Sequence, residues 1–429
     1  MNRIILVPRG NRAAGIPRPH PRARRLVAVA SVLGTALTLL APAVAAADSS
    51  PAGAASSASP GSVRLPVMPS SLTSGDSECT KPSKVHLDAV PWAQQSLGLG
   101  RVGRYTGGAG VTVGVVDTGV APDARRLGGR VEADGAAAED CVGHGTFVAG
   151  LIAASLSPNG GLSGVAPEAR IVAERGTDRS GIATAAGVAQ GIRDAVQSGA
   201  TVVDVSAALP APTPELTAAL AFAAGHDALV VAPAAPDGTA DESGPGSAAA
   251  PAAYWPASAD GVLSVLDVDI DGARAQDAYV PRHADLAAPG SGVTGIGPRG
   301  SGLYIGNGPS LAAAFVSGAA ALVRAHQPGL TAAQVAARLR ATAAPAAVPL
   351  LDPYNALSAV LPTVRSAPGH ADGSVHLAAP AHDSGTVRNA VLLGAGCALL
   401  AASVGAAAAL ARVRRSRRAA GSPARHHTV

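Results

Sequence analysis

The sequence predicts an α/β domain built on a mostly parallel sheet, with an apolar segment near each terminus. Short apolar strands alternate with helical segments between residues 111 and 342, the pattern of parallel strands joined by crossovers. Asp117, His144 and Ser310 each stand where a strand ends or a helix begins. Of the 429 residues 48% are apolar, which is enough to bury one large domain or two smaller ones.

Residues 1–47 have the features of a signal peptide. Arginines precede an uncharged run over residues 26–40, and three alanines at positions 45–47 supply a small-residue cleavage site. The run is short for a membrane-spanning helix, so we expect export and cleavage after Ala47. Residues 48–77 are rich in Pro, Ala, Ser and Gly, and they are too polar and too broken to pack alone.

Two of the three polar residues stand at the end of a predicted strand or at the start of a predicted helix. Asp117 ends a continuous apolar strand that begins at Val111, and a glycine turn comes after it. His144 stands at the head of a small-residue helix predicted over residues 146–154. In an open α/β sheet, reactive groups gather at the carboxyl ends of the strands and at the helix starts that follow them. We therefore expect Asp117 and His144 to lie at one edge of the sheet.

Ser310 follows a glycine turn and begins a small-residue run that predicts a buried helix through Val323. At a helix start, free backbone N–H groups and the helix dipole favour a developing negative charge, which suits a nucleophile. A serine is also a common helix N-cap, so this residue alone does not identify an active site. Together with Asp117 and His144 it completes the parts of an acyl-transfer triad, in the order Asp, His, Ser.

Apolar strands and helical segments fill the chain between these residues. Thr331 is a predicted helix cap, and Pro345 and Pro349 end the helix that it starts. The predicted strands cover residues 169–173, 202–206, 228–232 and 262–268, and the predicted helices cover 183–198, 216–224 and 331–342.

The C-terminal region contains a second uncharged segment, over residues 390–411, which is long enough to cross a bilayer. A buried helix is the alternative, but five arginines between residues 412 and 418 favour a membrane span with its C-terminal end in the cytoplasm. Basic tails also bind nucleic acid; membrane topology explains this one better, and the net charge of the chain is only +4. We expect no nucleic-acid partner.

Three segments resemble the signature boxes of subtilisin-like serine proteases: VVDTGV around Asp117, HGTFVAG at His144 and GPSLAAAFVSG at Ser310. Further segments are similar to the mycosin branch, the membrane-anchored subtilases of type VII secretion. These are PWAQQ at residues 91–95, the pair Asp140 and Cys141, and LAAPG at residues 286–290; the resemblance covers residues 90–361.

The resemblance implies a subtilisin-like three-layer sandwich, in which helices cover both faces of a central, mostly parallel sheet, with a C-terminal transmembrane helix added. The peptidase domain would be extracellular and tethered to the cell membrane by that single span. The expected parts are a signal peptide (1–47), a propeptide-like N-terminal extension (48–84), the peptidase domain (85–362), a flexible linker (363–389), the transmembrane helix (390–411) and a basic cytoplasmic tail (412–429).

The activity that the resemblance implies is that of a serine endopeptidase. Ser310 would attack a peptide carbonyl, His144 would take its proton, and Asp117 would hold the imidazole. The stretch Ser206, Ala207 and Ala208 stands where subtilases pair a substrate strand with their own backbone. The implied partners are a protein or peptide substrate, membrane lipid and the membrane components of a type VII secretion system.

Departures from the family pattern predict a weakened or very selective enzyme. Pro236 stands where subtilases carry the asparagine that donates to the oxyanion, and the neighbouring Asp237 would repel an oxyanion. Pro309 replaces a usual threonine before the nucleophile, Ala314 a usual proline, and Ala208 a usual glycine. A catalytically vestigial, protease-shaped scaffold subunit of the secretion machinery is therefore the alternative function.

Cysteine usage agrees with export. The resemblance implies a disulfide between Cys79 and Cys141, since mycosins commonly link the N-terminal extension to the loop that carries the histidine; two free thiols are the alternative. No cofactor and no metal are expected. The alternating carboxylates between Asp267 and Asp271 could contribute to a calcium site, although such segments are more often solvated turns.

Overall fold

The computed structural model describes residues 63–73, 78–157, 161–238 and 251–361, together with short helical pieces between residues 399 and 414. The predicted signal peptide and linker lie outside the described residues, and so does most of the predicted transmembrane segment and basic tail. Among the residues that the structure describes, no helix combines the length and the apolar character that crossing a bilayer requires.

A parallel sheet forms the centre of the described fold, and its seven strands lie in the order β2-β3-β1-β4-β5-β6-β7. The chain runs outward on both sides of β1, because β3 pairs with one edge of β1 and β4 with the other. Ligand sites of such sheets lie at the carboxyl ends of the strands where this reversal occurs. The strands are β1 (Thr112–Asp117), β2 (Val131–Glu132), β3 (Arg170–Arg175), β4 (Val202–Val205), β5 (Leu229–Pro233), β6 (Leu263–Val268) and β7 (Leu286–Pro289).

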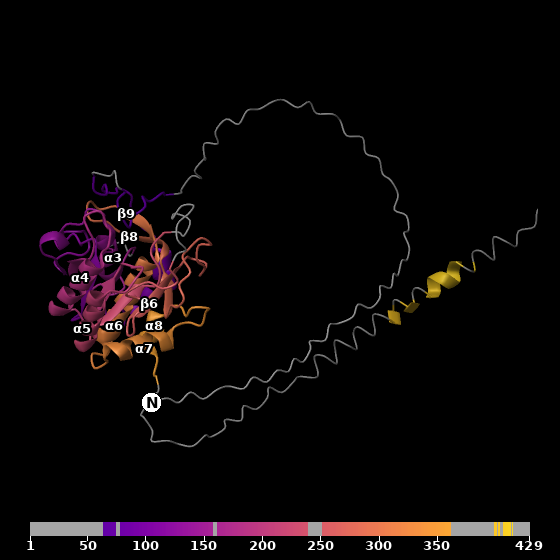
Figure 1. Ribbon diagram of the computed structural model, residues 1–429. Coiled ribbons are helices and arrows are strands. Elements are labelled where there is room, and N and C mark those ends of the chain that lie inside the picture. The colour runs from indigo at the N-terminus through magenta and orange to yellow at the C-terminus, as the bar shows by residue number, and fades with distance from the viewer. Residues whose placement is uncertain are drawn as a thin grey trace, which may run out of the picture. The chain divides into compact units, whose positions relative to one another are not determined.

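Helices cover both faces of this sheet (Figure 1). On one face α4 (Ala185–Gln197) and α5 (Pro214–Gly225) pack, and on the other α3 (His144–Ala153) and α6 (Pro309–His326). Side chains of β1 alternate between the two cores: Val115 packs on the α3 and α6 side, while Val116 packs on the α4 side. The predicted α/β architecture with a parallel sheet is confirmed.

Helix α6 runs through the core beneath the sheet. Its residues from Pro309 to Arg324 are buried, and a helix that is small and apolar on every side is stable only in such a place. The two helices that follow are capped as their sequences suggest. Thr331 and Gln334 form a capping box before α7 (Ala332–Thr342), and Asp352 accepts from the backbone of Asn355 at the start of α8 (Pro353–Ser358).

Several elements were not expected from the sequence. The largest is an antiparallel hairpin of β8 (Ser291–Ile296) and β9 (Leu303–Asn307), which leads directly into α6. Two short helices, α1 (Trp92–Ser96) and α2 (Leu99–Val102), precede β1, and a single 3₁₀ turn, η1 (Gly135–Ala138), precedes α3.

The described residues 63–73 and 78–84, which belong to the predicted N-terminal extension, lie against the α/β fold. Met68 N–H donates to the carbonyl of Ile305 in β9 at 2.8 Å, and Leu72 N–H donates to the carbonyl of Ser180 at 2.7 Å. The disulfide between Cys79 and Cys141 is formed, and it joins residues 62 positions apart. It attaches the extension to the loop that leads into α3.

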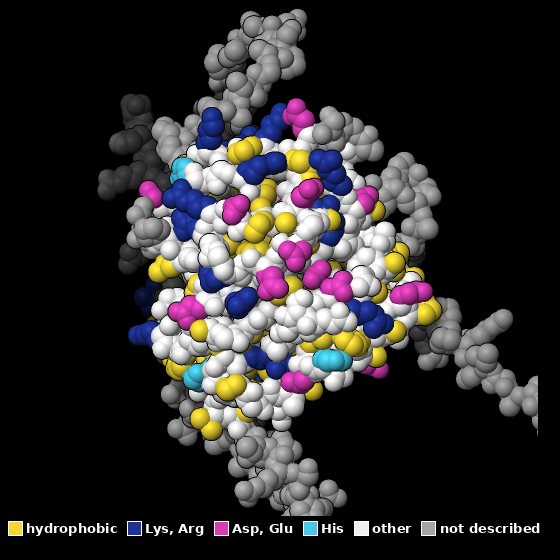
Figure 2. Space-filling model, turned by 90° about the vertical axis from the view of Figure 1, so that its left-hand side faces the viewer, with side chains coloured by type: hydrophobic (Ala, Val, Ile, Leu, Met, Phe, Trp, Pro, Cys, Tyr) yellow, Lys and Arg dark blue, Asp and Glu magenta, His cyan; other side chains and the backbone are white. Residues whose placement is uncertain are grey.

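Both acidic and basic side chains cover the face of the molecule that carries α4 and α5 (Figure 2). Lys and Arg side chains surround a loose band of Asp and Glu side chains on this face, with apolar side chains scattered between them. This face therefore presents a mixed-charge surface.

Candidate active site

Asp117 is the last residue of β1, at the point where the direction of strand order reverses. Its side chain is buried, and one carboxylate oxygen, Oδ1, accepts the N–H of Thr118 at 2.6 Å. The next residues turn sharply at Gly119, which has φ +104° and lies so close to the carbonyls of Ala137 and Glu139 that a side chain there would overlap them. The turn leaves the Asp117 carboxylate facing the start of α3.

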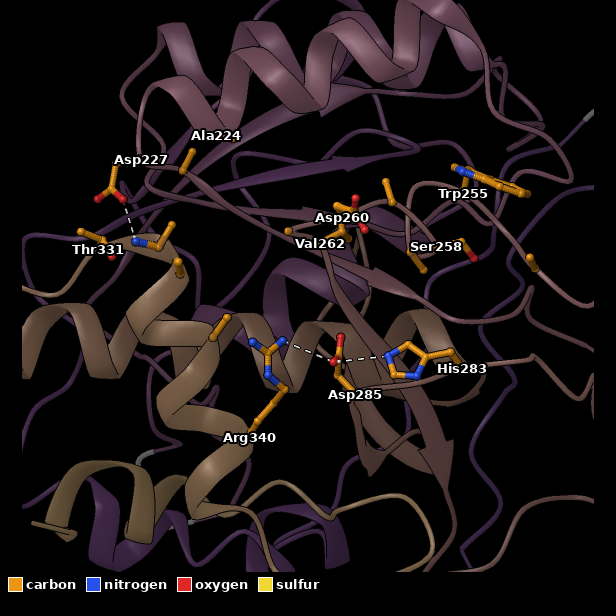
Figure 3. Close-up of a pocket in the computed structure, with 18 of the residues that line it drawn as sticks. Ala224, Asp227, Trp255, Ser258, Asp260, Val262, His283, Asp285, Thr331 and Arg340 are labelled. Carbon is orange, nitrogen blue, oxygen red and sulfur yellow. Dashed lines mark hydrogen bonds and ion pairs between the residues drawn. The ribbon is translucent and has the colours of Figure 1, made fainter. Parts of the chain in front are cut away.

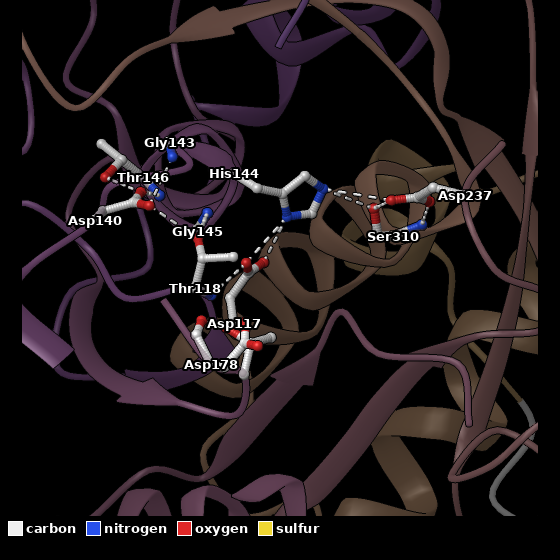
Figure 4. Close-up of polar contacts among 11 residues, drawn as sticks. Asp117, Thr118, Asp140, Gly143, His144, Gly145, Thr146, Asp178, Asp237 and Ser310 are labelled. Atoms are coloured by element: carbon white, nitrogen blue, oxygen red, sulfur yellow. Dashed lines mark hydrogen bonds and ion pairs between the residues drawn. The ribbon is translucent and has the colours of Figure 1, made fainter. Parts of the chain in front are cut away.

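His144 is the first residue of α3 and lies beside Asp117 (Figure 4). Its Nδ1 lies 2.8 Å from Oδ2 and 3.0 Å from Oδ1 of Asp117. Its Nε2 lies 3.1 Å from Oγ of Ser310. The three residues singled out in the sequence are thus brought together in one hydrogen-bonded line, although 166 positions separate His144 from Ser310.

Ser310 stands at the second position of α6 and is fully buried. Pro309 takes the first helical position, where the missing N–H is not needed and the fixed φ suits a helix. The proline therefore leaves the serine within reach of the imidazole. Gly308 precedes it with φ +143°, a backbone conformation that favours glycine.

Asp140 holds the start of α3 in place. The sequence predicted no such role for it, because Asp140 and Cys141 were only a point of similarity to mycosins. Its Oδ1 accepts from Gly143 N–H at 2.6 Å and from the Thr118 hydroxyl at 2.8 Å. Its Oδ2 accepts from the N–H and the hydroxyl of Thr146, at 2.8 and 2.6 Å. This buried carboxylate ties the turn after β1 to the first turn of α3, so it holds His144 in register with Asp117. Burial nevertheless raises the pKa of Asp140.

Asp237 joins the site in a way that the sequence did not predict. Its Oδ2 accepts from the Ser310 hydroxyl at 2.7 Å, and its Oδ1 accepts from the Ser310 N–H at 3.1 Å. The same Oδ2 lies 3.4 Å from Nε2 of His144. Pro236, which stands at the expected asparagine position, lines the adjoining cleft, and it is Asp237 that reaches the serine.

Electrostatics at the site favour an ionised aspartate and a protonated imidazole. Burial alone raises the pKa of Asp117, but the charge and hydrogen bond of His144 bring it below the ordinary value. Burial lowers the pKa of His144, whereas Asp117 and Asp237 raise it, and the net result is well above the ordinary value. The pKa of His144 is raised because its imidazole lies between the carboxylates of Asp117 and Asp237.

A cleft of about 290 Å³ adjoins the triad. The predicted substrate-binding residues Ser206, Ala207 and Ala208 follow β4 and line it, as do Asp117 and His144. Ser70 of the N-terminal extension also contributes to its wall.

The carboxylates at the end of β6 and in the turn that follows it are bound by other groups of the protein. Asp267 forms an ion pair with Arg274 at 3.2 Å, although burial raises the pKa of this carboxyl. Asp269 Oδ1 accepts from the N–H groups of Asp271 and Ala273, which closes a turn. Within the described ranges, no cluster of His, Cys, Asp or Glu side chains is arranged to hold a metal ion.

A larger cavity of about 700 Å³ lies at the opposite end of the sheet, beside the residues that precede β5, β6 and β7 (Figure 3). Asp285 lines the cavity and pairs with Arg340 at 3.3 Å and with His283 at 3.4 Å. Asp227 at its rim accepts from the backbone of Ala332 and pairs with Arg324. Because the charged groups of this cavity are paired with other groups of the protein, we place the chemistry at the triad instead.

Comparisons with known proteins agree with this geometry. The model of the subtilase family matches residues 108–383. Subtilisin Savinase of Lederbergia lenta is 36% identical over 264 residues, which cover 59% of this chain and 91% of that protein. Mycosin-4 of Mycobacterium tuberculosis is 36% identical over 292 residues, covering 58% of this chain and 63% of mycosin-4.

Among solved structures, a chain of an intact ESX-5 inner membrane complex is similar in fold. It has a TM-score of 0.57 and 27% sequence identity, and the match covers 77% of this chain and 93% of that one. The family model covers more than half of the present chain, and the subtilisin relative is matched over most of its own length. This chain therefore belongs to the subtilase family.

Proposed function

We propose that the chain is a membrane-anchored, extracellular serine endopeptidase of the mycosin type, associated with a type VII secretion system. The observation that carries the proposal is the continuous line from Asp117 through His144 to Ser310, with separations of 2.8 and 3.1 Å. Nucleophile, base and orienting carboxylate lie within hydrogen-bond reach of one another, as acyl transfer requires.

In the proposed reaction the Ser310 Oγ attacks the carbonyl carbon of a peptide bond, and its proton moves to Nε2 of His144. When the C–N bond breaks, the same proton passes to the leaving amine; water then releases the acyl group from the serine by the reverse path. Asp117 holds the proton-bearing Nδ1 and offsets the positive charge of the imidazolium. The N–H of Ser310, at the start of α6, is one donor that can face the developing oxyanion.

We assign the substrate strand to the cleft beside Ser206, Ala207 and Ala208. Their position directly after β4, next to the triad, supports this assignment, because an extended peptide can pair with the backbone that continues from the strand. Small side chains along this edge leave room for the peptide.

The proposed topology adds the parts that lie wholly or mostly outside the described residues. A signal peptide over residues 1–47 would export the chain, and a helix over residues 390–411 would anchor it, with the basic tail in the cytoplasm. The similarity to a chain of an ESX-5 inner membrane complex supports secretion-system membrane components as partners. The peptidase domain would then extend over residues 85–362.

A second candidate function is favoured by one contact at the site. The Asp237 carboxylate accepts hydrogen bonds from both the hydroxyl and the N–H of Ser310. A scaffold subunit could tolerate this contact, because it does not need a free nucleophile. A cell that carries Ser310→Ala in place of the wild-type gene distinguishes the two functions. A scaffold keeps secretion running with alanine and loses it only on deletion of the gene, whereas a required protease loses it in both strains.

The proposed enzymatic function predicts covalent labelling of Ser310 by a fluorophosphonate. The Oγ–P bond forms, the P–F bond breaks, the proton moves to His144 and fluoride leaves, so labelling reports the activated nucleophile itself. We expect an adduct mapped by mass spectrometry to Ser310 in the folded full chain, and none in Ser310→Ala. Absence of an adduct from both the wild-type chain and the Asp237→Asn variant described below would contradict the enzyme proposal.

A further inference from the structure

The Asp237 carboxylate occupies the positions that a reacting peptide needs. Both of its oxygens accept from Ser310, one from the hydroxyl at 2.7 Å and one from the backbone N–H at 3.1 Å. Figure 4 shows the carboxylate beside the serine on the side away from Asp117, so that it faces Nε2 of His144. Its side chain is 10% exposed, so the contact is formed inside the site.

The N–H of Ser310 is a donor that an oxyanion needs. When the serine attacks, the carbonyl oxygen of the substrate becomes negative and requires hydrogen-bond donors at about 2.7–3.1 Å. In the described arrangement that N–H already serves Asp237. An oxyanion at the same place would meet a second negative group in a largely buried site, and this arrangement is strongly unfavourable.

The same carboxylate also diverts the proton of the nucleophile. The Ser310 hydroxyl has only one hydrogen to donate. Its Oγ lies 2.7 Å from Oδ2 of Asp237 and 3.1 Å from Nε2 of His144, so the carboxylate is the nearer acceptor. The charge of Asp237 also helps to keep His144 protonated, and a protonated imidazole cannot act as a base. Donor, nucleophile and base are therefore all engaged by one side chain.

The fold leaves room for the Asp237 carboxylate at Gly308, and the neighbouring cleft gives this side chain somewhere to move. The carboxylate rests on Gly308, and a Cβ at that position would overlap it. On the opposite side Asp237 borders the cleft of about 290 Å³ that adjoins Ser206 and Ala207. A peptide bound in this cleft can displace the side chain from the serine.

We propose that Asp237 is a built-in occupant of the oxyanion-binding position, which keeps the folded protease latent until a bound peptide displaces its carboxylate. The proposal rests on the proposed function, since it concerns the same nucleophile. It makes Asp237 a specificity-determining residue: only peptides whose binding in the cleft outweighs the Ser310–Asp237 contact reach the nucleophile.

The test compares fluorophosphonate labelling rates of the wild-type full chain with those of Asp237→Asn and Asp237→Ala. Asparagine removes the charge and replaces one acceptor oxygen with an NH2 group, which can donate to an oxyanion beside the Ser310 N–H. Loss of one such donor from subtilisin, a relative of this chain, lowers turnover by about 10²–10³, so the reverse exchange is expected to raise the rate about 100-fold. Alanine frees the N–H without adding a donor, and we expect a smaller increase.

A pH profile separates this role from a merely structural one. The charged groups that face His144 are Asp117 from β1 and Asp237 from the loop after β5, with Asp204 of β4 buried nearby. Removal of the Asp237 charge lowers the pKa of His144, so the acid limb of the labelling profile should move to lower pH in Asp237→Asn. Asp123→Asn, which removes an exposed carboxylate elsewhere, is the matched control and should leave rate and profile unchanged.

Each outcome decides one point. Faster labelling and a shifted acid limb in Asp237→Asn support the proposal. Equal or slower labelling of both Asp237 variants, with a wild-type chain that does label, overturns it and leaves the enzyme function standing. No labelling of Ser310 in any folded variant rejects the proposed function and this inference together. Melting curves of all variants identify any that fail to fold.

Discussion

Gly145→Ala is expected to lower the labelling rate of Ser310 by at least about 100-fold, because a shift of roughly 1 Å in catalytic geometry costs that much. A Cβ on Gly145 would overlap the carbonyl oxygen of Gly119 and would lie 3.1 Å from Cβ of Asp117. Both neighbours belong to the turn that ends β1, and the carbonyl is backbone that cannot rotate away. The first turn of α3 must therefore move, and His144 moves with it.

The measurement is the fluorophosphonate labelling rate, followed together with thermal unfolding. Overpacking of this kind costs about 1–3 kcal/mol in stability, so the variant should still fold at moderate temperature while its site is displaced. Gly100→Ala is the control, since nothing lies within 4 Å of a Cβ at that position in α2. A Gly145→Ala chain that labels at the wild-type rate would show that the start of α3 is not held by this contact.

Asp204→Asn is expected to stabilise the protein at pH 8 and to leave its stability unchanged at pH 4. Asp204 is fully buried in β4; its Oδ1 accepts from the Ser317 hydroxyl at 2.6 Å, and among the described residues its Oδ2 has no hydrogen-bond partner. Burial raises the pKa of this carboxyl to about 7. An ionised Asp204 thus carries a desolvation cost that a neutral amide of the same shape avoids.

The sign of the pH dependence follows from the two states of Asp204. In the unfolded chain the carboxyl loses its proton near its ordinary pKa of about 3.9, and in the folded chain only near 7. Between these values the folded state binds the extra proton, so its stability falls as pH rises, and the full cost is present above pH 7. At 1.36 kcal/mol for each pKa unit, the expected gain at pH 8 is up to about 4 kcal/mol.

Urea unfolding at pH 4 and pH 8 measures this difference. Asp123→Asn serves again as the control, because its carboxylate is exposed. An equal gain for Asp204→Asn at both pH values would mean that packing, rather than the charge of Asp204, limits stability at this position.

Local sequence patterns predicted most of the main elements and placed Asp117, His144 and Ser310 at a strand end or a helix start. Asp117, His144 and Ser310 each belong to a segment whose residue types determine both the element and its end: an apolar strand before a glycine turn, and two small-residue helices. The structure places β1, α3 and α6 within a few residues of the predicted bounds. The cysteine pairing came from the family resemblance and is formed as expected.

The contacts missed from the sequence depend on where separate segments meet. The β8–β9 hairpin is short and contains several glycines, so its alternation of apolar and polar residues is weak. Comparison with the family pattern points to Pro236, whereas the path of the chain after β5 turns the next residue, Asp237, toward Ser310. No spacing in the sequence indicates that Asp140 accepts hydrogen bonds from both Thr118 and Thr146.

The attachment of the segment before α1 determines what a proteolytic cut in that segment would release. The extension contacts β9, just ahead of the nucleophile, through Met68, and it is covalently joined through Cys79 to the loop ahead of the imidazole. A proteolytic cut on the N-terminal side of Cys79 would release a piece whose described attachments are backbone pairing and side-chain packing. The residues from Cys79 onward would remain bonded to the loop at Cys141. A cut before Cys79 would therefore leave the loop that leads to His144 covalently attached as before.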